Sequence, residues 1–162
     1  MITLPDGKVL ITAEDVQNAC RKIVDKIKND YGMEDIVFDH IVMINRGGIV
    51  PGGYLSYYLN NRNTELLDIT LYEDNEEPRE VDTKTLIKIA DQLKKFNGKT
   101  ILLVDDLTDT GETIEAILEA NHRYTDVTIY TAVMYRGKNK KDLVDFYAEK
   151  KPKGWLVFPW DV

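Results

Sequence analysis

The segment ILLVDDLTDTGET, residues 101–113, constrains the possible folds more than any other part of the chain. Apolar residues run directly into two adjacent carboxylates, Asp105 and Asp106, and a turn of small and hydroxylated residues follows. Burying a charge is unfavourable unless the charge has a partner. We therefore expect a buried strand that ends at Val104, with the acid pair placed where it meets solvent or a ligand.

Strands and helices are predicted to alternate along the chain. Apolar residues at helical spacing indicate a first helix, with Thr12 as its N-cap and a stop at Gly32. Further helices are predicted in residues 50–60 and 112–124, and residues 86–99 form either a short helix or irregular structure. Strands are predicted in residues 41–44, 65–73, 100–104, 126–136 and 155–160. Such alternation predicts an α/β fold with a central parallel sheet flanked by helices.

Length and composition limit the class of protein. A chain of 162 residues suits one domain, 1–162, and 43% hydrophobic with 30% charged residues is typical of a globular protein. A net charge of -7 argues against nucleic acid as a partner, because no basic field attracts phosphate backbones. The single cysteine, Cys20, excludes an internal disulfide, and no apolar run is long enough to span a membrane. A signal peptide has an apolar region near its N-terminus, whereas this chain carries charges there. We therefore expect a cytoplasmic protein.

The turn after the acid pair has the features of a phosphate site. It leads into a helix, whose first backbone N–H groups lie at the positive end of the helix dipole. Thr110 and Thr113 add hydroxyl donors, and Gly111 allows the backbone to approach an anion closely. Asp105 and Asp106 would repel a phosphate unless they bind hydroxyl groups, a divalent metal, or both. A sugar phosphate with vicinal hydroxyls and a bound Mg²⁺ satisfies all of these groups.

A second strand-to-helix junction, INRGG, occupies the equivalent position in the pattern. In open parallel sheets, ligands bind beyond the carboxyl ends of the strands. The polar and acidic residues 74–85 are predicted to form a loop, and a long loop in a compact domain is more often functional than not. Each feature also has a plain structural alternative. The acid pair can be a solvated strand end, Arg46 can lie in an ordinary turn, and Trp155 and Trp160 can pack in the core.

The segment 101–113 resembles the phosphoribosyl-pyrophosphate (PRPP) motif of type I phosphoribosyltransferases, in which two acids, two variable residues and Asp-Thr-Gly-x-Thr follow an apolar strand. Residues 44–59, INRGGIVPGGYLSYYL, resemble the pyrophosphate loop of that family. Residues 145–161, DFYAEKKPKGWLVFPWD, resemble the tail of its hypoxanthine, guanine and xanthine branch. The three segments follow the family's order, so the resemblance covers nearly the whole chain.

The resemblance implies a type I phosphoribosyltransferase fold with a small hood formed by the chain ends. It implies transfer of phosphoribosyl from PRPP to a 6-oxopurine base, with Mg²⁺ as cofactor and a dimer as the common assembly. One alternative is a non-catalytic regulator that keeps the PRPP site, but the acidic balance gives no support for a nucleic-acid surface. Another is an enzyme for a pyrimidine or orotate, against which the tail WLVFPWD argues.

The resemblance also implies roles for single residues. Asp105 and Asp106 bind the ribose hydroxyls directly or through Mg²⁺, and Asp109 faces the base near N7 and manages its proton. The 5′-phosphate cradle comprises Thr108, Asp109, Thr110, Gly111, Glu112 and Thr113, with Glu112 pointing outward. Arg46 and Gly47 bind pyrophosphate, and Gly48 lets the loop approach it.

The expected base-binding residues lie near the end of the chain. Trp155 stacks on the purine, and Leu156 and Asp161 complete the set. Many purine enzymes of the family place a Lys after the fourth major strand to contact the 6-oxo group. This chain has VMYRGK there, so Arg136 is expected to take that place, with Lys138 as a second candidate. Arg79, in the acidic loop, is a further expected contact.

Overall fold

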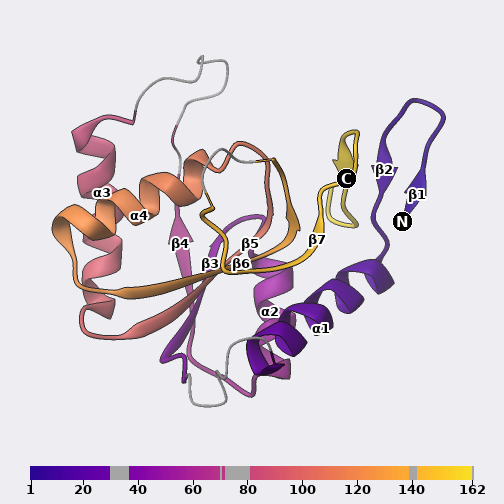
Figure 1. Ribbon diagram of the computed structural model, residues 1–162. Helices are drawn as coiled ribbons and strands as arrows, with labels where there is room; N and C mark the ends of the chain where they lie inside the picture. Colours follow the sequence, from indigo (N-terminus) through magenta and orange to yellow (C-terminus); the bar gives the residue numbers. More distant parts are fainter. Residues whose placement is uncertain (30–36, 70, 72–80, 139–141, 162) are drawn as a thin grey trace.

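The computed structural model describes residues 1–29, 37–69, 71, 81–138 and 142–161. Its centre is a sheet of five parallel strands in the order β4-β3-β5-β6-β7 (Figure 1). The strands are β3 (His40–Asn45), β4 (Thr64–Asp68), β5 (Thr100–Thr108), β6 (Thr128–Arg136) and β7 (Phe146–Lys150). The predicted α/β fold with a central parallel sheet is confirmed.

Helices cover both faces of this sheet (Figure 1). One face packs on α1 (Ala13–Asn29) and α2 (Ile49–Tyr58), and the other on α3 (Thr83–Leu93) and α4 (Glu112–Tyr124). A 3-10 turn, η2 (Lys94–Phe96), follows α3. Successive residues of β5 alternate between the two cores, and this double burial explains why the strand is an unbroken apolar run.

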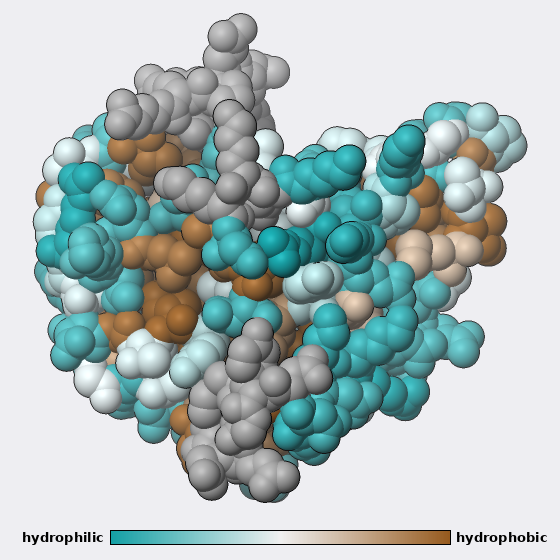
Figure 2. Space-filling view, viewed as in Figure 1, coloured by the Kyte–Doolittle hydropathy of each residue, from teal (hydrophilic) through white to brown (hydrophobic). Residues whose placement is uncertain are grey.

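The two ends of the chain form a separate small sheet, which we call the hood. Its strands are β1 (Ile2–Thr3), β2 (Val9–Leu10) and β8 (Leu156–Val157). β1 pairs antiparallel with β2, and β2 pairs parallel with β8. In Figure 1 the hood stands beside β7 and above the start of α1. The space-filling view shows that its surface combines apolar and hydrophilic side chains (Figure 2). The expected hood is therefore present.

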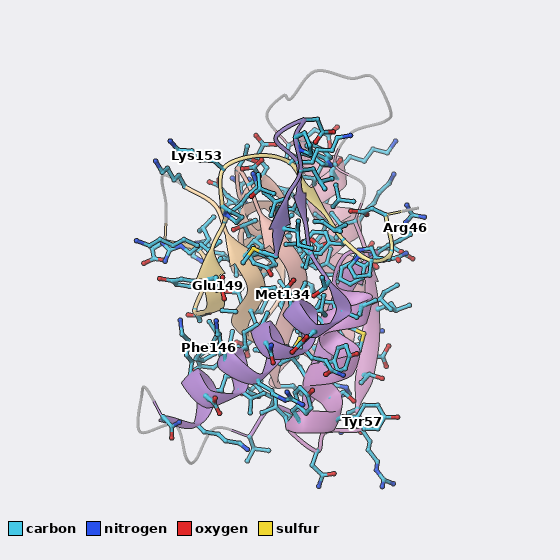
Figure 3. The ribbon with its side chains drawn as sticks, turned by 90° about the vertical axis from the view of Figure 1, so that its right-hand side faces the viewer. Arg46, Tyr57, Met134, Phe146, Glu149 and Lys153 are labelled. Carbon is cyan, nitrogen blue, oxygen red and sulfur yellow. The ribbon has the colours of Figure 1, made fainter. Side chains whose placement is uncertain are left out.

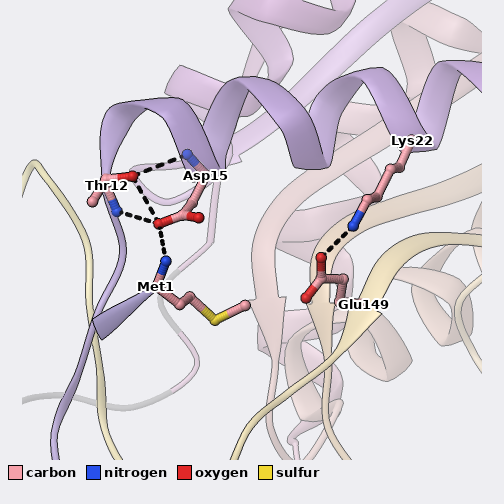
Figure 4. A network of polar contacts seen from close by, with 5 residues as sticks. All are labelled: Met1, Thr12, Asp15, Lys22 and Glu149. Carbon is pink, nitrogen blue, oxygen red and sulfur yellow. Dashed lines mark hydrogen bonds and ion pairs between the residues drawn. The ribbon is translucent and has the colours of Figure 1, made fainter. Parts of the chain in front are cut away.

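The start of α1 is fixed by the predicted N-cap. The Thr12 hydroxyl accepts a hydrogen bond from the Asp15 amide at 3.1 Å, and the Asp15 carboxylate accepts from the Thr12 amide at 2.9 Å (Figure 4). The same carboxylate pairs with the ammonium of Met1 at 2.6 Å. Further along α1, Lys22 pairs with Glu149 of β7 (Figure 4). These contacts join the hood, α1 and the sheet edge. The predicted stop at Gly32 lies outside the described residues.

Several predicted boundaries were wrong. Strand β5 continues past Val104 to Thr108, because its partner β6 extends equally far. Helix α3 begins at Thr83, where the Asp82 side chain accepts a hydrogen bond from the Thr85 amide. The short strands β1 and β2 and the edge strand β7 were not predicted. Most of the predicted loop 74–85, with Arg79, lies outside the described residues. No helix in the described part of the chain is long and apolar enough to cross a membrane.

Candidate functional site

Two loops meet at the carboxyl edge of the sheet. A Cβ atom added at Gly47 would lie 2.7 Å from the carboxylate of Asp106, and one at Gly48 would collide with the carbonyl of Val104. The loop after β3 therefore rests directly on β5, and only glycine fits there. The peptide bond between Asn45 and Arg46 is cis, a feature that the sequence does not reveal. Figure 3 shows Arg46 projecting outward from the half of the molecule that carries the hood, whereas Tyr57 lies at the opposite end.

The acid pair interrupts the ladder of the sheet. The amide of Asp106 donates to the Asp105 carboxylate at 2.9 Å, and the amide of Leu107 donates to the Asp106 carboxylate at 2.7 Å. The pairing of β5 with β6 has no partner for Asp106, and it resumes at Leu107. Leu102 and Val104 pack towards α1 and α2, and beyond the acid pair Leu107 does the same. The register of β5 against β6 is the same on both sides of the acid pair, with Asp105 opposite Val133 and Leu107 opposite Tyr135.

Burial raises the pKa of both carboxyl groups. Desolvation is the main cause for Asp105, and the neighbouring charge of Asp106 adds to it; together they raise its pKa to about 8. Desolvation, with the charge of Asp161, raises the pKa of Asp106 to about 6, against hydrogen bonds from the Leu107 amide and the Trp160 side chain. Two ionised carboxylates at this position therefore need a cation or hydroxyl donors as partners.

The described residues contain no cluster of three acidic, His or Cys side chains that could hold a metal. Asp105 and Asp106 supply hard oxygen donors, which Mg²⁺ prefers, and Mg²⁺ commonly completes its shell with water and substrate oxygens. The raised pKa values of the pair indicate that a divalent cation would relieve the repulsion between them. The donor set therefore fits Mg²⁺ bound together with a phosphorylated substrate.

The turn after β5 leads directly into α4, at the place where the sequence predicts a phosphate cradle. Gly111 has φ of 85°, a left-handed conformation that favours glycine, and α4 begins at the next residue, Glu112. Gly111 provides no side-chain cap, so the first amides of α4 can receive an anion. Thr110 is exposed, and Thr113 is half-buried in the first turn. Thr108 differs from these two threonines, because its side chain is buried within β5.

Asp109 follows the strand end and points to solvent, with 68% of its side chain exposed. The Nζ atom of Lys151 lies 3.6 Å from its carboxylate. Between them stands Gly137, where a Cβ atom would lie 2.5 Å from the Thr108 carbonyl oxygen and 2.7 Å from that of Asp109. The ends of β5, β6 and β7 therefore lie tightly side by side, and they bring Asp109 and Lys151 together.

The tail places one large aromatic side chain at the surface. Trp155 is 74% exposed, although its carbonyl accepts a hydrogen bond from the Val9 amide at 2.8 Å. Gly154, with φ of 105°, packs on the carbonyl of Gly7, where a Cβ atom would collide. Leu156 is buried in the hood. The N-terminal hairpin thus fixes the backbone around Trp155 and leaves its ring free.

The last described residues reach the acid pair. The Trp160 ring stacks on Phe158 with centroids 4.8 Å apart, and its side chain donates a hydrogen bond to Asp106. The Asp161 carboxylate accepts from the Phe158 amide at 2.8 Å, which closes a turn. Trp160 and Lys151 had no predicted role in the site. The sequence favours a core position for Trp160, and nothing in the lysine-rich stretch around Lys151 distinguishes it from its neighbours.

Arg136 lies at the end of β6, as expected, but its side chain has other partners. Its guanidinium pairs with Asp142 at 2.8 Å and lies 5.0 Å from the ring centre of Tyr147. Lys138 is exposed. The contact of Arg136 with a base stays a prediction, as do the other individual roles assigned to site residues.

Comparisons with known proteins agree with this fold. The family model of the phosphoribosyl transferase domain matches residues 12–162. A xanthine-guanine phosphoribosyltransferase from Idiomarina loihiensis is 29% identical over 122 residues, which span 75% of this chain and 70% of the relative. A crystal structure of a purine phosphoribosyltransferase from Pyrococcus horikoshii aligns with a TM-score of 0.67 at 25% identity, over 96% of this chain and 94% of the other.

A third similar structure is the xanthine-guanine-hypoxanthine phosphoribosyltransferase of Helicobacter pylori. It aligns with a TM-score of 0.68 at 22% identity and covers 96% of this chain and 94% of its own, which supports the fold. The family model covers the central sheet, both junctions and the tail. The chain therefore belongs to the phosphoribosyl transferase domain family.

Proposed function

We propose that the protein transfers the 5-phosphoribosyl group of PRPP to a 6-oxopurine base, giving a nucleoside monophosphate and pyrophosphate. The observation that carries this proposal is the contact of Gly47 with the Asp106 carboxylate. It brings the loop suited to pyrophosphate against the acids suited to ribose hydroxyls, as one PRPP molecule requires. The names of the Idiomarina and Pyrococcus relatives support a purine as the acceptor.

PRPP occupies the edge formed by β3 and β5. Asp105 and Asp106 bind the ribose 2′- and 3′-hydroxyls, and the amides from Thr110 to Thr113 receive the 5′-phosphate at the start of α4. Arg46 offers a planar fork to the pyrophosphate, while the missing side chain of Gly47 allows close approach. Asp105 and Asp106 would hold Mg²⁺ together with PRPP, and the metal would supply positive charge for the leaving pyrophosphate.

The base binds against the exposed ring of Trp155, which provides a flat apolar surface. Asp109 faces the base near N7 and takes the proton that the purine loses when it attacks the ribose. Its exposure leaves the carboxylate free for this contact. Leu156 pairs with Val9 in the hood, and Asp161 closes a turn with Phe158, so both help to hold the base-binding tail.

The regulatory alternative keeps PRPP binding without chemistry. The comparisons give it no support, and the combination of Asp109 with a free stacking ring favours catalysis. Several features stay predictions: a single domain in residues 1–162, a dimer, a cytoplasmic location, and the absence of nucleic-acid and membrane partners.

A base panel tests the proposal directly. The protein is incubated with PRPP, Mg²⁺ and hypoxanthine, guanine, xanthine, adenine or orotate, and nucleotide products are resolved by chromatography. We expect monophosphates from one or more 6-oxopurines, and none from the double variant Asp105→Asn with Asp106→Asn. PRPP binding without product from any base would favour the regulatory alternative. Full activity of the double variant would remove the acid pair from the site.

A further inference from the structure

Lys151 has no role in the site as described so far, yet its position is unusually well fixed for a lysine. Its amide donates to the Arg136 carbonyl at 2.7 Å, which continues the pairing of β7 with β6 by one residue. Only 18% of its side chain is exposed. Its ammonium lies 3.6 Å from the Asp109 carboxylate and 3.5 Å from the Gly154 carbonyl oxygen. The ammonium therefore lies between the cradle turn and the residue that precedes Trp155.

Stability does not explain this arrangement well. An ion pair with a carboxylate as exposed as that of Asp109 contributes little to stability. Ordering a lysine side chain costs conformational entropy, which offsets that contribution. A role towards a ligand would account for a lysine held at this position.

The chemistry of the base edge matches this pair of groups. In a 6-oxopurine, N7 and the 6-oxo oxygen lie side by side on one edge. If Asp109 contacts the edge at N7, the neighbouring ammonium of Lys151 lies beside the oxygen. An ammonium has only donors, so it suits an oxo acceptor and opposes the amino group of a 6-aminopurine.

We propose that Lys151 is a specificity-determining residue that donates a hydrogen bond to the 6-oxo oxygen of the base. The inference rests on the proposed function and adds to it, because it assigns the 6-oxo contact to the loop after β7 rather than to the end of β6. The Arg136 guanidinium, engaged by Asp142 and Tyr147, leaves that contact to Lys151.

The test compares hypoxanthine with unsubstituted purine, which lacks the 6-oxo group, in the parent and in Lys151→Gln. A charged hydrogen bond of this kind corresponds to roughly a 10- to 100-fold effect. We expect the KM for hypoxanthine to rise by this factor in the variant, with an unchanged KM for PRPP. The preference of the parent for hypoxanthine over purine should fall to near unity.

Lys153→Gln is the matched control, because Lys153 lies in the same loop and points outward in Figure 3. Lys153→Gln removes the same charge and should keep the KM values and the base preference of the parent. If Lys151→Gln does not fold, Lys151→Met, with a side chain of similar length, replaces it. Fluorescence titration with IMP and AMP gives a second readout, in which the variant should lose most of the preference for IMP.

The outcomes separate the two proposals. No nucleotide from any base with the parent would overturn the proposed function. An active parent with an unchanged hypoxanthine preference in Lys151→Gln would overturn the role of Lys151 alone. Equal rises in the KM for PRPP and for base, with a lower Tm, would make Lys151 a structural residue and also overturn the inference.

Discussion

Residues 45–48 and 105–113, which we call the PRPP side, extend directly from the central strands β3 and β5. Residues 151–161, which we call the base side, leave the edge strand β7 and are held by the hood. The PRPP side is supported by a sheet buried on both faces. The base side is supported by short strands from the chain ends. The proposed assignment of the two sides thus implies that base recognition can vary without changes to the core, whereas PRPP recognition cannot.

The largest expected effect lies where the two sides meet, at Asp109. Asp109→Asn should keep the fold and PRPP binding but lower kcat roughly 10²–10⁴-fold, the usual contribution of a general acid or base. The loss should be greater at neutral than at high pH, because a purine that has already lost its proton needs less help. Profiles of kcat against pH for both proteins measure this. Equal turnover at every pH would exclude Asp109 from the chemistry.

Trp155→Ala should affect the base side alone. Loss of stacking on an exposed ring should raise the KM for the base by about 1–3 kcal/mol in free energy, with the KM for PRPP unchanged. Steady-state kinetics with each substrate varied in turn provide the measurement. An unchanged KM for the base would mean that the ring has no part in binding, and a rise in both values would contradict the division into two sides.

Gly154→Ala tests whether the hood positions the base side. The added Cβ would collide with Gly7 at a positive φ, where strain of about 1–3 kcal/mol is usual. We expect a roughly tenfold higher KM for the base and little change for PRPP. Gly98→Ala is the control, because Gly98 also has a positive φ, of 72°, but has nothing within 4 Å. If both variants raise the KM for the base equally, strain and not the hood contact is responsible.

The smallest effect concerns stability on the PRPP side. Burial raises the pKa of Asp105 to about 8, so between pH 4 and 8 the folded state holds a proton that the unfolded state has lost. Stability of the ligand-free protein should therefore fall as pH rises through this window. Asp105→Asn removes this fall in stability and should raise the Tm at pH 8 by a few degrees. This rise corresponds to a free energy of unfolding on the order of 1–2 kcal/mol higher than that of the parent. Thermal melts in EDTA from pH 4 to 8 give the Tm of both proteins as a function of pH. Parallel curves of Tm against pH would contradict the prediction.

Structural features whose determinants are contiguous along the chain could be predicted. The acid pair, Gly111 and the start of α4 follow one another along the chain, so their local pattern predicts the junction between strand, turn and helix. The alternation of apolar segments likewise predicts the sheet. The N-cap of α1 was predicted because Thr12 and Asp15 act within one turn.

Features that depend on distant pairing were not predicted. Lys151 meets Asp109 only because β5, β6 and β7 end together and Gly137 lets them lie close. Trp160 reaches Asp106 only because the hood turns the tail back to the sheet. Strand β7 lies at the sheet edge and mixes apolar and charged residues, and β1 and β2 have two residues each, so their periodicity is too weak to detect.

The pairing of β2 with β8 has a consequence for the order of folding. Val9 lies opposite Leu156, so nearly the whole chain lies between the two partners. Contacts of such long sequence separation form late, because the intervening chain must first be ordered. The central sheet, built from neighbouring segments, can form before the two ends meet. We therefore expect a refolding chain to acquire PRPP binding before base binding, with the hood as the last part to assemble.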